Sequence, residues 1–121
     1  MSISVAARKN KGRKLQYWVC KKISELLNIS WNQDDDNSLI QSRLGGQSGV
    51  DIILRNEIQQ QFPFSVECKW QETWAIHAWI RQAITNQKEG TDWLIVAKRN
   101  KEKEVIIIDA ERFFELLRSK R

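Results

Sequence analysis

The chain has 121 residues, of which 41% are hydrophobic and 29% charged, and its net charge is +5. This length fits a single domain with its own core, and no apolar run approaches the roughly 20 residues that a membrane span requires. No apolar stretch follows the first charges, so the sequence predicts no secretory signal peptide and favours a cytoplasmic protein with two free thiols, Cys20 and Cys68.

The first predicted element is a helix over residues 14–28, where apolar side chains recur every three or four positions. Residues 1–13 precede it and are expected to form a basic, flexible N-terminal segment. No acidic residue interrupts a run of seven basic ones: Arg8, Lys9, Lys11, Arg13, Lys14, Lys21 and Lys22. Such a run is either a solvated helix face or a surface that contacts phosphates, and the charge alone leaves both open.

Three strand-like runs follow, over residues 38–44, 50–55 and 63–70, and the first is the weakest. A second helix is predicted over residues 74–89, with Ile76, Ile80, Ala83 and Ile84 on its inner side. Two apolar strands at 92–97 and 104–108 come next, and Asp109 is expected to cap a last helix. This order predicts an α/β domain with a mixed central sheet flanked by helices.

Charged residues interrupt two of the apolar strands. Side chains alternate along a strand, so Glu67 and Lys69 share one face, whereas Cys68 points to the other. Asp51 begins the neighbouring apolar run, and pairing of the two strands would bring both carboxylates to the lysine. Charges on an otherwise apolar strand are costly unless they meet partners. We therefore expect these three side chains to converge.

Two carboxylates suit a hard cation such as Mg²⁺ or Mn²⁺. Such an ion polarises a phosphodiester and acidifies a bound water. A lysine beside it can orient the attacking water or neutralise charge in the transition state. The alternative is an ordinary aspartate together with a structural Glu–Lys pair on a half-exposed strand.

An Asp followed by Glu-x-Lys on the next strand resembles the PD-(D/E)XK nuclease superfamily, and here these residues are Asp51 and Glu67-Cys68-Lys69. The resemblance is strongest to archaeal-type and phage Holliday junction resolvases. They also carry a Lys-Gly near the first helix, seen here as Lys11-Gly12, and a Gly- and Ser-containing loop before the Asp, seen here as residues 45–49. In order of elements the resemblance covers nearly the whole chain, although its specific residues are few.

The resemblance implies a restriction-endonuclease-like αβββαβ core, extended by a C-terminal strand and helix, with residues 1–121 forming one nuclease domain. It also implies a Mg²⁺- or Mn²⁺-dependent enzyme in which Asp51 and Glu67 bind the metal. The backbone carbonyl of Cys68 would add a ligand, and Lys69 would act on the water. The resolvases usually place a glutamate on the first helix that joins the metal site, but the matching residue here is Gln16.

A neutral amide is a weaker metal ligand than a carboxylate. Whether Gln16 reaches the metal site is therefore left open by the sequence. Gln82 and Ser48 are further accessory residues that the resemblance suggests. DNA phosphates would be held by basic side chains of the first helix and the following strand, namely Lys9, Lys11, Arg13, Lys14 and Arg43.

The predicted function is cleavage of branched DNA, in particular four-way junctions, by a homodimer inside the cell, with a phage genome as a candidate source. One catalytic site cuts one strand, so a two-fold dimer would supply the two matched cuts that a junction requires. Two alternatives remain. One is another nuclease of the superfamily, such as a restriction-like or repair nicking enzyme. The other is a catalytically silent nucleic-acid-binding domain, since a fold alone does not establish activity.

Overall fold

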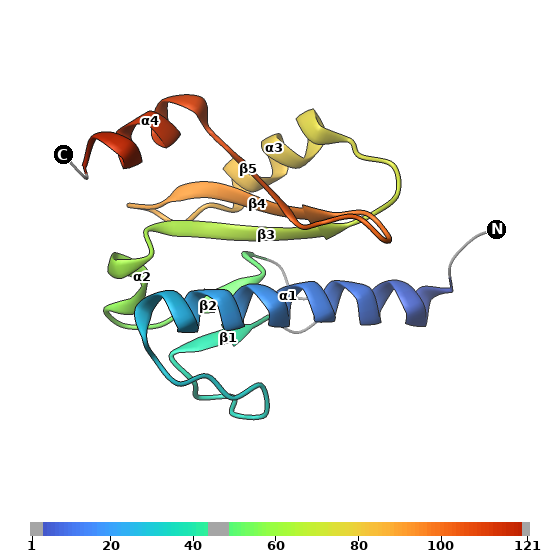
Figure 1. The fold of residues 1–121 in the computed structure, drawn as a ribbon, viewed down its shortest axis with the longest axis horizontal. Coiled ribbons are helices and arrows are strands. Elements are labelled where there is room, and N and C mark those ends of the chain that lie inside the picture. The colour runs from blue at the N-terminus through green and yellow to red at the C-terminus, as the bar shows by residue number, and fades with distance from the viewer. Residues whose placement is uncertain (1–3, 44–48, 120–121) are drawn as a thin grey trace.

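The computed structural model describes residues 4–43 and 49–119. Its elements, in chain order, are α1 (Val5–Leu27), β1 (Ile40–Ser42), β2 (Ile52–Leu54), α2 (Ile58–Gln61), β3 (Phe64–Trp70), α3 (Ile76–Asn86), β4 (Asp92–Lys98), β5 (Val105–Ile108) and α4 (Ala110–Arg118). Figure 1 shows α1 as a long helix on one side of β3, with α3 on the other side. The predicted order of elements is found, with the short helix α2 added between the second and third strands.

The first helix begins at Val5 rather than Lys14. The side chain of Ser4 caps it by accepting a hydrogen bond of 3.1 Å from the backbone N–H of Ala7. The basic segment that was expected to be flexible is therefore helical from Val5 onward. The apolar pattern misses these turns because burial of α1 begins only at Leu15, and lysine and arginine are themselves good helix formers.

The sheet β3-β4-β5 has a helix packed on each face. Strands β3 and β4 are parallel and β4 and β5 antiparallel, so the sheet is mixed, as predicted. Alternate residues of β4 enter two different apolar clusters. Leu94 and Val96 pack with the buried side of α1, whereas Ile95 and Ala97 pack with Trp79 of α3. The expected mixed sheet with flanking helices is thus found.

Strands β1 and β2 form a separate antiparallel pair, so the expected single sheet is divided in two within the described residues. The two parts meet where the backbone N–H of Asp51 donates a 3.0 Å hydrogen bond to the carbonyl of Val66. The ladder does not continue there because the next N–H of β3 on that edge, that of Cys68, binds the Asp51 side chain instead of a backbone carbonyl.

Helix α3 buries part of the side that the sequence predicted, because Ala83 and Ile80 pack in the cluster against β4 as expected, but the helix is rotated toward Trp79. Its buried residues are Trp79 and Ala83, whereas Ile76 and Ile84 are 40% and 50% exposed. The large indole of Trp79 sets the orientation of this short helix. At the end of the chain, the Asp109 carboxylate accepts a hydrogen bond from the Arg112 N–H, so the predicted cap of α4 is confirmed. None of the helices within residues 4–43 and 49–119 combines the length and apolar character of a membrane span.

Candidate active site

A polar cavity of about 340 Å³ lies where α1, the segment before β2, β3 and α3 come together. It collects the three predicted catalytic side chains and two of the predicted accessory ones. The residues around it are Gln16, Gly49, Asp51, Glu67, Cys68, Lys69, Gln82 and Asn86. Side chains that are far apart in the sequence therefore share one small space, although the two strands that carry the acidic residues do not form a regular ladder.

Asp51 is fixed from both its backbone and its side chain. Its carboxylate oxygen Oδ2 accepts a 2.7 Å hydrogen bond from the N–H of Cys68, and its carbonyl accepts one of 2.7 Å from the N–H of Arg43. The chain enters this position through Gly49, whose φ of +104° is a backbone conformation that side chains disfavour. The guanidinium of Arg43 donates to the Val50 carbonyl and closes the same turn.

Glu67 lies in the middle of β3 and is only 4% exposed. Its oxygen Oε1 accepts a 3.0 Å hydrogen bond from the side-chain amide of Asn86 on α3. Sequence reasoning missed Asn86 because it placed the centre of the inner side of this helix at the isoleucines and left Trp79 out of it. Once Trp79 is taken as the buried anchor, Gln82 and Asn86 fall three and seven residues later, on the side that faces β3.

Lys69 follows two residues after Glu67 on the same face of β3. Its ammonium donates a 2.8 Å hydrogen bond to the side-chain carbonyl of Gln82, one helical turn before Asn86. The predicted alternation along the strand therefore holds, and α3 contacts both side chains with neutral amides. A neutral partner orients the lysine without forming an ion pair that would occupy it.

Burial raises the pKa of both carboxyl groups. For Asp51 the pKa rises because of desolvation, and the Cys68 N–H and the Lys69 charge oppose this rise. For Glu67 desolvation and the nearby Asp51 charge raise the pKa to about 7, against the hydrogen bond from Asn86. Two like charges in one small cavity thus resist full ionisation at neutral pH. A bound cation would relieve that repulsion.

The donor atoms around the cavity fit a hard divalent cation. Within residues 4–43 and 49–119, no cluster of three or more His, Cys, Asp or Glu side chains forms, so the acidic donors are Asp51 and Glu67. Carboxylate oxygens are donors that Mg²⁺ and Mn²⁺ prefer, and the neutral amide side chains of Gln16, Gln82 and Asn86 border the same space. The N–H of Cys68 points toward Asp51, and its carbonyl lies on the same edge of the strand.

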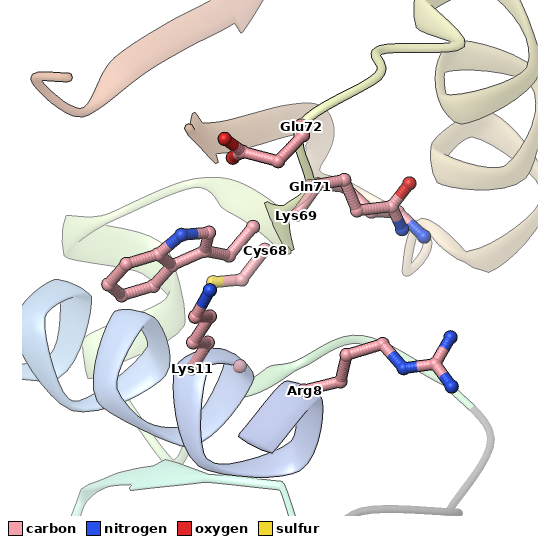
Figure 2. A pocket seen from close by; sticks show the side chains of 8 residues that line it. Arg8, Lys11, Cys68, Lys69, Gln71 and Glu72 are labelled. Carbon is pink, nitrogen blue, oxygen red and sulfur yellow. The ribbon is translucent and has the colours of Figure 1, made fainter. Parts of the chain in front are cut away.

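Most of the basic residues predicted to bind DNA lie on two sides of α1. Lys9, Arg13 and Arg43 line one cavity of about 550 Å³. Lys11 lines another of about 550 Å³, together with Arg8 and Lys69, and Figure 2 shows Arg8 and Lys11 extending from α1 below the end of β3. Lys14 is exposed and lines neither cavity. Ser48, the remaining predicted residue, lies outside the described residues.

A mixed sheet flanked by helices, with an aspartate and a Glu-x-Lys strand at one cavity, is typical of nucleases of the PD-(D/E)XK type. Residues 7–121 match the family model described as "Phage putative PDDEXK endonuclease". The match spans nearly the whole chain, and the chain belongs to this family. Searches of the curated proteins and of the solved structures found no match. The predicted superfamily is therefore confirmed at the level of a phage endonuclease family.

The raised pKa of Glu67 predicts that the metal-free protein loses stability as the pH rises. The folded state holds the proton up to about pH 7, against an ordinary value of 4.5. The contribution of the protonated Glu67 to the free energy of unfolding is therefore complete below the ordinary pKa. It is lost as the pH rises through the pKa of the folded state. From about pH 5 to about pH 8 in EDTA, the free energy of unfolding should fall by roughly 1–3 kcal/mol relative to Glu67→Gln.

Urea denaturation across this pH range checks the prediction, and Glu67→Gln is the matched control because it keeps an acceptor for Asn86 without the charge. Mn²⁺ or Mg²⁺ should restore the stability of the unmodified protein at the higher pH and have little effect on the variant. Parallel pH profiles for the two proteins would contradict the raised pKa.

Proposed function

We propose that the protein is a divalent-metal-dependent endonuclease that hydrolyses phosphodiester bonds in DNA. The observation that carries this proposal is the meeting of Asp51, Glu67 and Lys69 in one polar cavity. Membership of a PD-(D/E)XK endonuclease family supports the same reaction class. The contacts of the lysine ammonium with Gln82 and of the glutamate with Asn86 support this proposal over a structural Glu–Lys pair.

Asp51 and Glu67 are the side chains that would hold Mg²⁺ or Mn²⁺, with the Cys68 carbonyl as a further ligand. When bound, such an ion polarises the phosphodiester and lowers the pKa of a coordinated water. The bond from the Cys68 N–H fixes the direction of the Asp51 carboxylate, and the Asn86 amide fixes that of Glu67. Preorganised ligands of this kind need little rearrangement when the ion and substrate arrive.

Lys69 would orient the attacking water and stabilise the negative charge that develops on the phosphate. Its bond to Gln82 holds the ammonium at the mouth of the cavity, on the strand face shared with Glu67. Gln16 borders the same cavity from α1, where its neutral amide could position a water or a phosphate oxygen. We propose Gln16 and Gln82 as accessory residues rather than as primary ligands.

Phosphates on either side of the cleaved bond would contact the basic residues of α1 and Arg43, which follows β1 directly. Lys9, Arg13 and Arg43 line one cavity beside the proposed metal site, and Lys11 lines the other. Lys14 and Ser48 stay as proposed contacts on the basis of the sequence alone. Because these contacts reach the backbone and not the bases, they favour recognition of DNA shape over DNA sequence.

Conservative changes at the three central residues should abolish cleavage while the fold is retained. Asp51→Asn and Glu67→Gln keep acceptors for the Cys68 N–H and for Asn86, and Lys69→Met keeps the aliphatic stem. Each should lower the cleavage rate by about 100-fold or more, the scale of loss for a preorganised charge in an active site. The assay follows a nicked or linearised plasmid in Mg²⁺ and in Mn²⁺, with EDTA expected to stop the reaction.

Glu89→Ala is the matched control, because this carboxylate is exposed and lies outside the cavity. Ca²⁺ should support DNA binding without cleavage, since its looser coordination activates water poorly. Wild-type rates in a folded Asp51→Asn or Glu67→Gln protein, or full cleavage in EDTA, would overturn the assignment. Metal-dependent binding without cleavage of any DNA would favour the silent nucleic-acid-binding alternative.

We propose further that the enzyme acts as a homodimer on branched DNA, in particular on four-way junctions. The described residues of each chain form one such site, so symmetric cleavage of two strands would need two chains. An apolar groove of about 280 Å³ offers a surface for the second copy, between the second half of α1 and the β4–β5 hairpin. Leu26 and Ile106 border this groove and are 69% and 59% exposed.

Helix α4 presents a second exposed apolar surface. It has no buried residue, and Phe113, Phe114 and Leu117 are each about half exposed. The Arg112 side chain attaches this helix to the sheet through a 2.8 Å ion pair with Asp92. Exposed apolar surface of this extent is typical of a protein interface, and we propose that a second copy covers it.

Light scattering at micromolar concentration should give a dimer mass, and Ile106→Glu combined with Phe114→Glu should give a monomer. A charge placed in an apolar interface is costly unless it is paired. The matched control is Ile84→Glu, because Ile84 is 50% exposed but lies on α3, on the other face of the sheet. In a competition assay, the dimer should cleave a four-way junction in preference to the same sequence as linear duplex.

A monomer with and without DNA would contradict the dimer proposal. Equal cleavage of junction and duplex would contradict the preference for branched DNA. That second outcome would favour the restriction-like or repair nicking alternative within the same superfamily, and it would leave the assignment of the three central residues untouched.

A further inference from the structure

Gly12 occupies an unexpected position for a glycine, inside a regular helix. It lies within α1, which runs from Val5 to Leu27, and its φ is not among the positive values of the chain. Glycine is the least favourable helix residue after proline, so the backbone conformation does not explain it. Packing does not explain it either, because a Cβ added at Gly12 would have no heavy atom within 4 Å.

The side of α1 that carries Gly12 is the side that packs on the core farther along the helix. Gly12, Val19 and Ile23 share this side by helical spacing, and Val19 and Ile23 are 4% and 2% exposed. Gln16, between them on the same side, borders the proposed metal site. Figure 1 shows that the first turns of α1 extend past the end of β3. The inner side of the helix therefore continues beyond the core into open space at Gly12.

Basic side chains flank this open position on both sides. Gly12 lines the cavity that contains Arg8 and Lys11 and also the cavity that contains Lys9 and Arg13. Gly12 is the residue that lines both of these cavities. Each of the two cavities also has a lining residue in common with the proposed metal site. Lys69 lines the first cavity as well as the metal site, and Gln16 lines the second as well as the metal site.

Lys11 is held in place within the first cavity. Its ammonium donates a 2.8 Å hydrogen bond to the side-chain carbonyl of Asn100, which also accepts a 2.8 Å bond from the indole N–H of Trp70. A lysine ammonium has three donors, so this bond positions Lys11 and leaves donors for a phosphate. The cavity wall next to Gly12 is thus preformed.

We propose that one strand of the substrate DNA crosses α1 at Gly12, with its phosphates divided between the two basic cavities. This inference rests on the proposed nuclease function and adds the path of the strand to it. A glycine lets the sugar-phosphate backbone approach the helix closely, whereas any larger side chain would separate the two cavities. The strand then leads directly to the cavity of Asp51 and Glu67, beyond Gln16.

The test is DNA binding by Gly12→Leu, measured by fluorescence anisotropy with a labelled duplex and a labelled four-way junction in Ca²⁺. Leucine favours the helix over glycine, so the thermal midpoint should stay the same or rise. The dissociation constant should nevertheless increase by about tenfold or more, because the basic side chains of one cavity no longer reach their phosphates. The slope of log Kd against log salt should fall by about 0.9 for each phosphate that is no longer bound, although the substitution changes no charge.

Asn10→Leu is the matched control, since residue 10 is exposed and lies on the opposite side of the same helix. It should leave both the affinity and the salt slope at their wild-type values. Gly12→Ala, which adds a single methyl group in open space, keeps the test usable if the leucine variant does not fold, and should weaken binding in the same direction.

Wild-type affinity and salt slope in folded Gly12→Leu and Gly12→Ala proteins would overturn the strand path while leaving the nuclease proposal intact. Absence of DNA binding and of cleavage in the unmodified protein would reject the nuclease proposal itself. Equal weakening by Asn10→Leu and Gly12→Leu would also overturn the inference, because it would indicate a general effect of an apolar residue on α1.

Discussion

The hydrogen bond between the Cys68 N–H and the Asp51 carboxylate is the interaction on which the rest of the site depends. It joins the β1–β2 pair to the three-stranded sheet where regular pairing stops after a single backbone bond. The same bond orients the Asp51 carboxylate toward Glu67. One contact therefore both joins the two sheets and positions an acidic group of the site. A backbone carbonyl in that place would continue the sheet but would leave the cavity with one acidic group fewer.

The sequence indicated the central features because they follow from strand periodicity. Alternation alone predicted that Glu67 and Lys69 share a face and that Cys68 points away, and the element order predicted the mixed sheet. The division into two sheets could not be predicted, because it depends on a side chain replacing a backbone acceptor at Asp51. Ser48 and the rest of residues 44–48 lie outside the described part of the chain.

Two helices departed from the predictions for different physical reasons. The periodicity of α1 begins at Leu15 because the earlier turns have no core to cover, so the helix start at Val5 left no apolar signal. In α3, isoleucines dominated the apolar pattern, but the single indole of Trp79 fills the space against the sheet and turns Ile76 and Ile84 to solvent. That rotation concealed Asn86, whose contact with Glu67 has no local signature.

The amide contacts of α3 have a geometric consequence for the Glu-x-Lys pattern itself. Gln82 and Asn86 are four residues apart and bind Lys69 and Glu67, which are two apart. Four helical residues rise about 6 Å and two strand residues about 6.6 Å. The spacing of the two amides along α3 therefore nearly equals the spacing of Glu67 and Lys69 along β3. Antiparallel alignment of α3 on β3 thus lets one helix set the separation of both groups, and a displacement of the helix along its axis would shift them in concert.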